Sequence, residues 1–216
     1  MASPSPSAPA DERLPLGSVL DGRYRVDDLV GIGGMGSVYR CEHTGIGRPV
    51  AIKAIRPGVF ATGEAGERFL REIRYAAQLG HPHILPLYDS GEIAGPGGPA
   101  TLFYVMPLVE GESLRARLDR QKQLPIDEAL SIAREVADAL GYAHQRGIIH
   151  RDIKPENILL EGSHAVVADF GIARAIDSAG ADKLTETGLT VGTPLYMSPE
   201  QASGDANLDG RSDLYA

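Results

Sequence analysis

The chain has 216 residues, a single cysteine and a formal net charge of −8 at neutral pH. This acidic balance argues against sequence-independent nucleic-acid binding, which needs a surplus of cations facing the phosphates. One cysteine excludes an intrachain disulfide and argues against a cysteine-based zinc site. No apolar run approaches the length of a membrane span, and the N-terminus lacks the basic and apolar regions of a secretory signal. We therefore expect a soluble protein of the cytoplasm.

The first half of the chain is expected to be a disordered leader followed mainly by strands. Residues 1–16 are rich in Pro, Ser and Ala and have little apolar bulk to bury, which predicts the leader. Short runs of apolar, β-branched and aromatic residues then predict strands. The predicted strands cover residues 24–26, 37–41, 49–55, 85–89 and 101–107, and a loop rich in Gly and Pro covers 93–100.

Two helices are predicted from apolar residues at helical spacing. The first covers 64–79 and ends before Pro82, because proline disfavours the helical conformation in its predecessor. The second follows Pro125 and ends at Gly147. Its expected buried stripe consists of Ala129, Ile132, Ala133, Val136, Ala137, Leu140 and Ala143. Short strands are predicted beyond it at 148–149, 158–160 and 166–168, and a long loop over 174–195.

A glycine cluster follows the first predicted strand, with the spacing Gly31-x-Gly33-x-x-Gly36. This spacing occurs in dinucleotide-binding folds, where it opens a helix, and in hairpins that cover phosphates. Here residues 37–39 favour a strand, so we predict the hairpin. The absence of a Gly-Lys-Ser/Thr sequence excludes a Walker phosphate loop. For the cluster taken alone, a merely flexible turn is the alternative.

Lys53 is the one charged residue of the apolar strand predicted over 49–55. A buried amine is costly without an anionic partner. Nucleotide phosphates are one candidate partner, and Glu72 of the following helix is another. A lysine that reaches solvent from an edge strand is the alternative.

Residues 149–160 place acid, base and amide side chains at fixed spacing between apolar strands. They include His150-Arg-Asp152-Ile-Lys154-Pro-Glu-Asn157, and Asp169-Phe170-Gly171 closes the next apolar strand. Together with the glycine hairpin and the Lys53 strand, in this order, the motifs resemble those of the protein Ser/Thr kinases, in particular the bacterial eukaryotic-like class. The resemblance covers the chain from residue 24 to its end.

This resemblance implies an α+β fold with two lobes. A β-rich small lobe with the hinge would cover residues 17–109, and the first part of a mainly helical large lobe would cover 110–216. The implied cofactors are ATP and Mg²⁺. The implied ATP contacts are Gly31, Gly33, Gly36, Val38, Ala51, Lys53, Met106, Val109 and Leu159, and the implied Mg²⁺ ligands are Asn157 and Asp169. In the family arrangement, Lys53 pairs with Glu72.

The same resemblance implies transfer of the ATP γ-phosphate to Ser or Thr hydroxyls of protein substrates. Asp152 would orient the substrate hydroxyl and accept its proton, and Lys154 would neutralise the transferred group. Thr193 would line the substrate pocket. His150 is expected to pack against Phe170 rather than to carry a proton.

Regulation by phosphorylation is also implied, because Arg151 precedes Asp152 and kinases with this arginine commonly need a phosphate in the activation loop. The candidate phosphosites are Thr185, Thr187 and Thr190. Autophosphorylation is expected at one or both of the first two, with self-association of the chain as its route. Threonines that only keep the loop soluble are the alternative.

The last residues resemble the start of the central helix of the large lobe. Asp213 is expected to brace the catalytic loop, and Glu200 to lack the arginine that pairs with it in the family. We therefore expect a kinase domain truncated at its C-terminus, and a membrane anchor beyond it is an open alternative. The expected activity is that of an ATP-dependent Ser/Thr protein kinase, and a non-catalytic nucleotide-binding or regulatory remnant is the alternative.

Overall fold

The computed structural model describes residues 13–56, 63–93, 100–170, 194–205 and 207–216. The chain forms two compact units. Unit 1 comprises Met1–Val59 and Asp89–Leu108, and unit 2 comprises Phe60–Tyr88 and Val109–Ala216. Each unit has a hydrophobic core of its own. None of the described helices is both long and apolar enough to cross a membrane.

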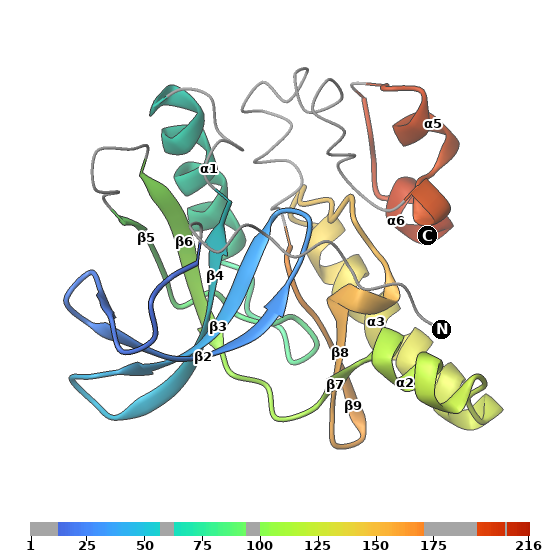
Figure 1. Ribbon diagram of the computed structural model, residues 1–216. Coiled ribbons are helices and arrows are strands. Elements are labelled where there is room, and N and C mark those ends of the chain that lie inside the picture. The colour runs from blue at the N-terminus through green and yellow to red at the C-terminus, as the bar shows by residue number, and fades with distance from the viewer. Residues whose placement is uncertain (1–12, 57–62, 94–99, 171–193, 206) are drawn as a thin grey trace. The chain divides into compact units, whose positions relative to one another are not determined.

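Unit 1 is an antiparallel sheet with the strand order β1-β2-β3-β4-β6-β5 (Figure 1). The strands are β1 Val19–Leu20, β2 Tyr24–Ile32, β3 Gly36–His43, β4 Arg48–Ile55, β5 Asp89–Ile93 and β6 Thr101–Pro107. Successive side chains of a strand point to opposite faces, so Val50, Ile52 and Ala54 of β4 enter the core together. The intervening residues of β4 therefore lie on the other face.

The sequence predicted most strands of unit 1 but not all their ends. β2 is longer than expected and continues through Gly31, with irregular register between Val26 and Asp28 and between Leu29 and Gly31. Most of the expected leader, residues 1–12, lies outside the described residues. Leu14 is attached to unit 1, because its N–H donates to the Tyr39 hydroxyl at 3.1 Å and its side chain packs on the core.

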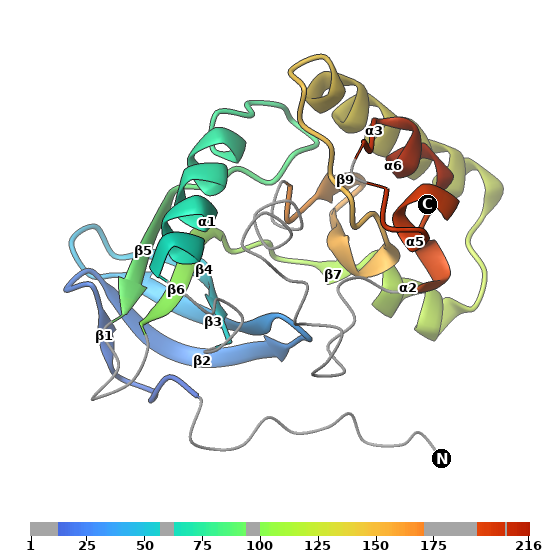
Figure 2. The same ribbon diagram turned by 90° about the horizontal axis from the view of Figure 1, so that it is seen from above.

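Unit 2 combines helices with a small antiparallel sheet in the order β7-β8-β9. Within it, α3 packs along β9 (Figure 2). The helices are α1 Gly63–Ala76, α2 Leu114–Gln121, α3 Ile126–His144, α5 Pro199–Ala202 and α6 Arg211–Tyr215, with 3-10 turns η2 Pro155–Asn157 and η4 Pro194–Tyr196. The strands are β7 Glu112–Ser113, β8 Ile158–Glu161 and β9 His164–Val167.

The long helix α3 is confirmed, but its predicted buried stripe was too wide. The helix ends at His144, Gly147 follows it in the left-handed region (φ +73°), and the N–H of Ile148 donates back to the Ala143 carbonyl at 3.0 Å. Ala129, Ala133 and Ala137 are exposed, whereas Ala139 is buried. The methyl group of alanine suits either face, so alanine spacing alone does not identify the face that packs on β9. The buried stripe is Ile132, Val136, Ala139, Leu140 and Ala143.

Two predicted strands are wrong because other contacts use their backbone. Residues 85–88 form no strand, since the Leu85 N–H donates to the Val167 carbonyl at 2.9 Å, and β5 begins only at Asp89. Residues 148–149 form no strand either, since Ile148 caps α3. The helix α2 was not predicted.

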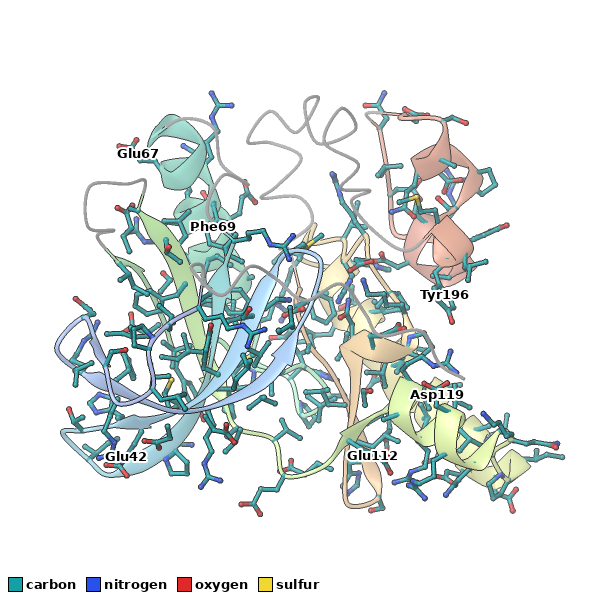
Figure 3. The ribbon with its side chains drawn as sticks, in the orientation of Figure 1. Glu42, Glu67, Phe69, Glu112, Asp119 and Tyr196 are labelled. Atoms are coloured by element: carbon teal, nitrogen blue, oxygen red, sulfur yellow. The ribbon has the colours of Figure 1, made fainter. Side chains whose placement is uncertain are left out.

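Helix α2 begins at a side-chain cap and is held by an ionic network. The Ser113 hydroxyl accepts the Ala116 N–H at 3.2 Å. One carboxylate oxygen of Glu112, which is labelled in Figure 3, accepts hydrogen bonds from Arg117 Nε and from Arg120 Nη2, each at 2.5 Å. The hydrogen bond from Arg117 is the main reason why the pKa of Glu112 is lowered. The polar residues of this short helix thus secure it without any buried side chain of its own.

The boundary between the units partly differs from the expected lobes. The break between Leu108 and Val109 is close to the expected one at 109, but Phe60–Tyr88 belongs to unit 2. The reason is that Leu79 and Ile84 are members of the unit 2 core. The backbone of the same segment is also bonded to β9, where the Val167 N–H donates to the His83 carbonyl at 2.9 Å.

Candidate active site

The expected ATP-binding residues of unit 1 share one face of its sheet. Val38 pairs with Lys53, and Ala51 pairs with Met106. Directly paired residues point to the same side, and Ala51 and Lys53 are two residues apart on β4. All four therefore lie on the face opposite the core. An apolar surface with the Lys53 amine beside it suits a flat base that carries phosphates.

The glycine cluster is a hairpin between β2 and β3, as predicted. The Gly33 N–H donates to the Gly36 carbonyl at 2.8 Å. A side chain at Gly31 or Gly34 would meet no atom within 4 Å, so the backbone there borders open space. Gly36 differs, because a Cβ would lie 2.1 Å from the Ala54 carbonyl oxygen. Gly36 is thus required by the close approach of β3 to β4, a need that the motif alone did not reveal.

Lys53 lies at the centre of this sheet face rather than on an edge strand. Its strand β4 has β3 on one side and β6 on the other. Its Nζ lies 5.9 Å from the centroid of the Tyr104 ring, within the range of a cation–π contact. The alternative of a lysine reaching solvent from an edge strand is therefore wrong.

Glu72 is carried by α1 in unit 2, so its expected pairing with Lys53 stays a prediction. Glu72 lines a cavity of about 720 Å³ in unit 2, together with Arg71 and Tyr75 of α1 and with residues 146–149. Two other expected ATP contacts are also in unit 2. Val109 opens its second segment, and Leu159 lies on β8 between Ser113 and Val166.

Two predicted catalytic residues and one predicted Mg²⁺ ligand converge in the loop before β8. Lys154 Nζ donates to Asp152 Oδ2 at 2.7 Å, and Asn157 Nδ2 donates to the same oxygen at 3.0 Å. Asn157 Nδ2 also donates to the Asp152 carbonyl at 2.8 Å. The Asp152 side chain is 15% exposed, so its carboxylate is held by two donors and still reaches solvent.

Asp213 braces this loop as predicted. Its side chain is 0% exposed, and its two oxygens accept the backbone N–H groups of His150 at 2.8 Å and Arg151 at 2.7 Å. His144 Nε2 lies 2.7 Å from the same carboxylate. The backbone of this loop is not held by the hydrogen bonds of a helix or a sheet. The buried carboxylate of Asp213, which accepts from three donors, fixes it instead.

Two residues of the loop system adopt the left-handed conformation although they are not glycine. Arg151 has φ +68° and Asp169 has φ +65°. Such conformations cost about 1–3 kcal/mol and persist where the surroundings hold them. The bonds to Asp213 hold Arg151 in this way. The strain therefore falls on the residue before the expected base and on the expected metal ligand.

His150 is a packing residue, as predicted. It is completely buried, its ring lies 4.7 Å from the Phe170 ring in an edge arrangement, and Nε2 lies 2.8 Å from the Ala168 carbonyl oxygen. Because Nδ1 accepts the Asp152 N–H at 3.2 Å, both ring nitrogens are used. The imidazole thus ties the loop to the strand that leads to Asp169.

The carboxylate of Glu200, expected to lack the arginine that pairs with it in the family, has a serine hydroxyl as its partner. The Ser212 hydroxyl donates to Glu200 Oε1 at 2.6 Å. That bond, followed by the residue's own backbone N–H, lowers the pKa of Glu200. A neutral hydroxyl in α6 thus stabilises the carboxylate.

Gln201 is a supporting residue that the sequence analysis missed. Its Nε2 donates to the Arg151 carbonyl at 2.7 Å, while Ser198 and Gln201 form a reciprocal capping box at the start of α5. The signal was present, because a Ser followed three residues later by Gln is typical of such a cap. The bond to Arg151 could not be predicted, since it joins residues 50 positions apart.

The donor set at Asn157 and Asp169 fits Mg²⁺. Asn157 uses its amide nitrogen on Asp152, so its amide oxygen would be the atom that binds a metal ion, and the carboxylate of Asp169 would be the second expected ligand. Among the described residues no group of three or more His, Cys, Asp or Glu could hold a metal ion. Two protein oxygens suit Mg²⁺, which keeps waters and takes further ligands from phosphates. Thr185, Thr187, Thr190 and Thr193 lie outside the described residues.

Known proteins are similar to this chain in sequence. Residues 24–216 match the protein kinase domain family. The serine/threonine-protein kinase PknB of Mycobacterium leprae is 41% identical over 91% of this chain, and the serine/threonine-protein kinase pkn2 of Myxococcus xanthus is 44% identical over 92%. The chain spans 31% and 24% of the length of these two relatives.

The fold is also similar to solved structures. A crystal structure of the Mycobacterium tuberculosis PknI kinase domain matches with a TM-score of 0.74 and 36% sequence identity. The match covers 94% of this chain and 74% of that one. The β-rich unit 1 and the helical unit 2 thus have the composition expected of a kinase-like fold.

Proposed function

Because the chain belongs to the protein kinase domain family, we propose that it transfers the γ-phosphate of ATP to Ser and Thr hydroxyls of proteins. The observation that carries this proposal is the pair of bonds on Asp152. Lys154 and Asn157 both bind Oδ2, so within the described part of the chain Oδ1 has no hydrogen-bond partner. A carboxylate oxygen held in a fixed orientation can act as the general base that accepts the proton of the substrate hydroxyl.

In the proposed reaction, the substrate oxygen attacks the γ-phosphorus. The bond between the γ-phosphorus and the oxygen that bridges it to the β-phosphorus breaks, and ADP leaves with that oxygen. Asp152 orients the hydroxyl and takes its proton. Lys154, bonded to the same carboxylate, carries a positive charge beside the transferred group. Asn157 and Asp169 would hold Mg²⁺, which neutralises phosphate charge when bound. Thr193 is proposed to line the substrate pocket.

In each unit, separate residues are proposed to contact ATP. In unit 1, the backbone at Gly31 and Gly33 would approach the phosphates, with Gly36 fixing the hairpin. The apolar face of Val38, Ala51 and Met106 would contact adenine, and Lys53 would hold the α- and β-phosphates and pair with Glu72. Val109 and Leu159 of unit 2 would complete the adenine contacts. The shared sheet face of the unit 1 residues supports this assignment.

The test is transfer from Mg-ATP to a generic protein substrate by the 216-residue chain and by Asp152→Asn. Removing a general base typically costs about 10²–10⁴-fold in rate, so we expect Asp152→Asn to lose transfer to that extent while it still binds ATP. Glu161→Gln, an exposed acid at the end of β8, is the matched control. ATP binding without any transfer by the unmodified chain would select the alternative, a non-catalytic nucleotide-binding or regulatory remnant. The names of the relatives do not favour that alternative.

We further propose that the chain phosphorylates itself at Thr185, Thr187 or both, with Thr190 as a third candidate, through self-association. Mass spectrometry of the active chain and of Asp152→Asn should find phosphate on these threonines only in the former. A rate per molecule that rises with protein concentration would support reaction between two chains. An active chain without phosphate on this segment would contradict the proposal.

Since ATP is the donor, we place this activity in the cytoplasm.

A further inference from the structure

Three histidines and two carboxylates gather in unit 2, and none of them has a role in the proposed reaction. His81 and His83 lie in the segment after α1, His164 opens β9, and Glu135 and Asp138 come from α3. The ring centroids of His83 and His164 are 6.1 Å apart, and those of His81 and His83 are 5.7 Å apart.

The hydrogen bonds of His83 and His164 fix the same tautomer in both rings. His83 Nδ1 lies 2.9 Å from the Ala165 carbonyl oxygen, which can only accept, so Nδ1 carries the proton. His164 Nδ1 lies 3.3 Å from Glu135 Oε1, a carboxylate that likewise accepts. In each neutral ring the lone pair is then on Nε2.

This pattern is that of metal-binding histidines. Such residues bind the ion through one ring nitrogen and donate the other N–H to a carbonyl or carboxylate, which orients the ring. Glu135, the carboxylate in this case, is itself fixed, because its Oε2 accepts the Ala165 N–H at 2.5 Å and its side chain is only 16% exposed. The outer contacts of a two-imidazole site are thus already formed.

His81 is the opposite tautomer to that of His83 and His164. Its Nδ1 accepts the His83 N–H at 3.2 Å, so its proton is on Nε2, which lies 3.3 Å from Asp138 Oδ2. Its ring also lies 5.0 Å from that of Tyr142. Neither nitrogen of His81 offers a lone pair. The cluster therefore contains two candidate metal ligands, His83 and His164. It also contains one neighbouring histidine, His81, that should not bind the metal ion.

We propose that His83 and His164 together bind a divalent cation that prefers imidazole, such as Zn²⁺, through their Nε2 atoms, with water as the remaining ligands. A Zn–N length of about 2.1 Å and a tetrahedral angle place two ring centroids roughly 5 Å apart. The 6.1 Å separation needs a small closing movement, which His164 allows because its side chain is 68% exposed. With two protein ligands, the site binds less tightly than a closed four-ligand site.

Such an ion would join the segment around His83 to the β8–β9 hairpin. Both belong to the folded unit 2, where the Val167 N–H already donates to the His83 carbonyl. An ion that binds only the folded state raises the midpoint of thermal unfolding. The thiol of Cys41 should not compete, since burial raises its pKa to about 12.

The test is calorimetric titration of the chain, without a histidine tag, with Zn²⁺ alone. Asparagine can donate the bond now made by Nδ1 but lacks the Nε2 lone pair, so His83→Asn and His164→Asn are the chosen variants. We expect each to weaken Zn²⁺ binding about tenfold or more, and His81→Asn to leave it unchanged. Zn²⁺ should raise the unfolding midpoint of the chain and of His81→Asn only.

Binding that His83→Asn and His164→Asn leave intact would overturn the proposal. An equal loss in His81→Asn and His83→Asn would also overturn it, because the ligands would then be the other histidine pair. His164 is the first residue of β9 and its side chain is exposed, so His164→Asn should fold even if His83→Asn does not. None of these readouts depends on phosphoryl transfer.

Discussion

The two units position their functional residues in different ways. In unit 1, the register of β3, β4 and β6 places Val38, Lys53 and Met106 on one face, and backbone hydrogen bonds maintain that register. In unit 2, the loop that carries Asp152 has little regular structure. Its shape depends on side chains, above all Asp213 and His150, that bond to its backbone.

This difference predicts where function can be changed without loss of the fold. A ligand-facing side chain of unit 1 can be replaced while the sheet keeps its register. In unit 2 the supporting side chains are buried, so fold and activity should fail together. Three substitutions measure what the supporting contacts in each unit contribute.

The largest effect is expected for Asp213→Ala. It removes the acceptor of the His150 and Arg151 N–H groups and the partner of His144. Removing one partner of a buried ionic interaction typically costs 3–5 kcal/mol, so we expect the free energy of unfolding to fall by roughly 3–5 kcal/mol. We expect phosphoryl transfer to be lost as well. Urea unfolding and the kinase assay measure the two effects.

Asp209→Ala is the control for that substitution. Asp209 is an exposed acid of the same segment, and hydrogen bonds from Arg211 lower its pKa to about 2. Exposed ion pairs contribute about 0–1 kcal/mol, so both stability and transfer should change little. Equal losses in the two variants would contradict the bracing role of Asp213.

The next effect is expected for Gly36→Ala compared with Gly34→Ala. A Cβ at position 36 would lie 2.1 Å from the Ala54 carbonyl oxygen, whereas one at position 34 would meet nothing within 4 Å. Overpacking costs typically 1–3 kcal/mol, so Gly36→Ala should destabilise unit 1 by roughly that amount and weaken ATP binding. Gly34→Ala should leave thermal unfolding nearly unchanged. Similar unfolding midpoints for the two variants would show that the hairpin is not held by this close approach.

The smallest effect is expected for Tyr24→Phe and depends on pH. Burial, and then the bond from the Tyr24 hydroxyl to Asp89 Oδ2 at 2.9 Å, raise the pKa of Tyr24 to about 12. An unfolded tyrosine loses its proton near pH 10. Between pH 10 and 12 the unfolded chain therefore binds fewer protons than the folded one, and this contribution to stability falls as pH rises.

At pH 8, Tyr24→Phe should lower the free energy of unfolding by roughly 1.5 kcal/mol, the lower value for a hydrogen bond to a charged group. At pH 11 the difference from the unmodified chain should shrink. Tyr75→Phe, at an exposed position of α1, should show neither effect. A difference that is constant between the two pH values would contradict the role given to Tyr24.

The sequence by itself determined the family, the order of the motifs and most elements. Strands and helices follow from local periodicity, and the kinase-like motifs are contiguous runs such as 149–160. The roles of His150 and Asp213 were also predicted, and the contacts of both residues confirm them. These features depend on neighbours along the chain or on a resemblance that the motifs carry.

Only the tertiary structure decided which groups meet across long stretches of chain. It assigned Phe60–Tyr88 to unit 2, gave Glu200 the hydroxyl of Ser212 and joined Gln201 to Arg151. It also brought His83 and His164 together and fixed their tautomers through Ala165 and Glu135. The physical reason is that these bonds form between groups brought into contact by burial of two separate cores, and no local pattern records such contacts.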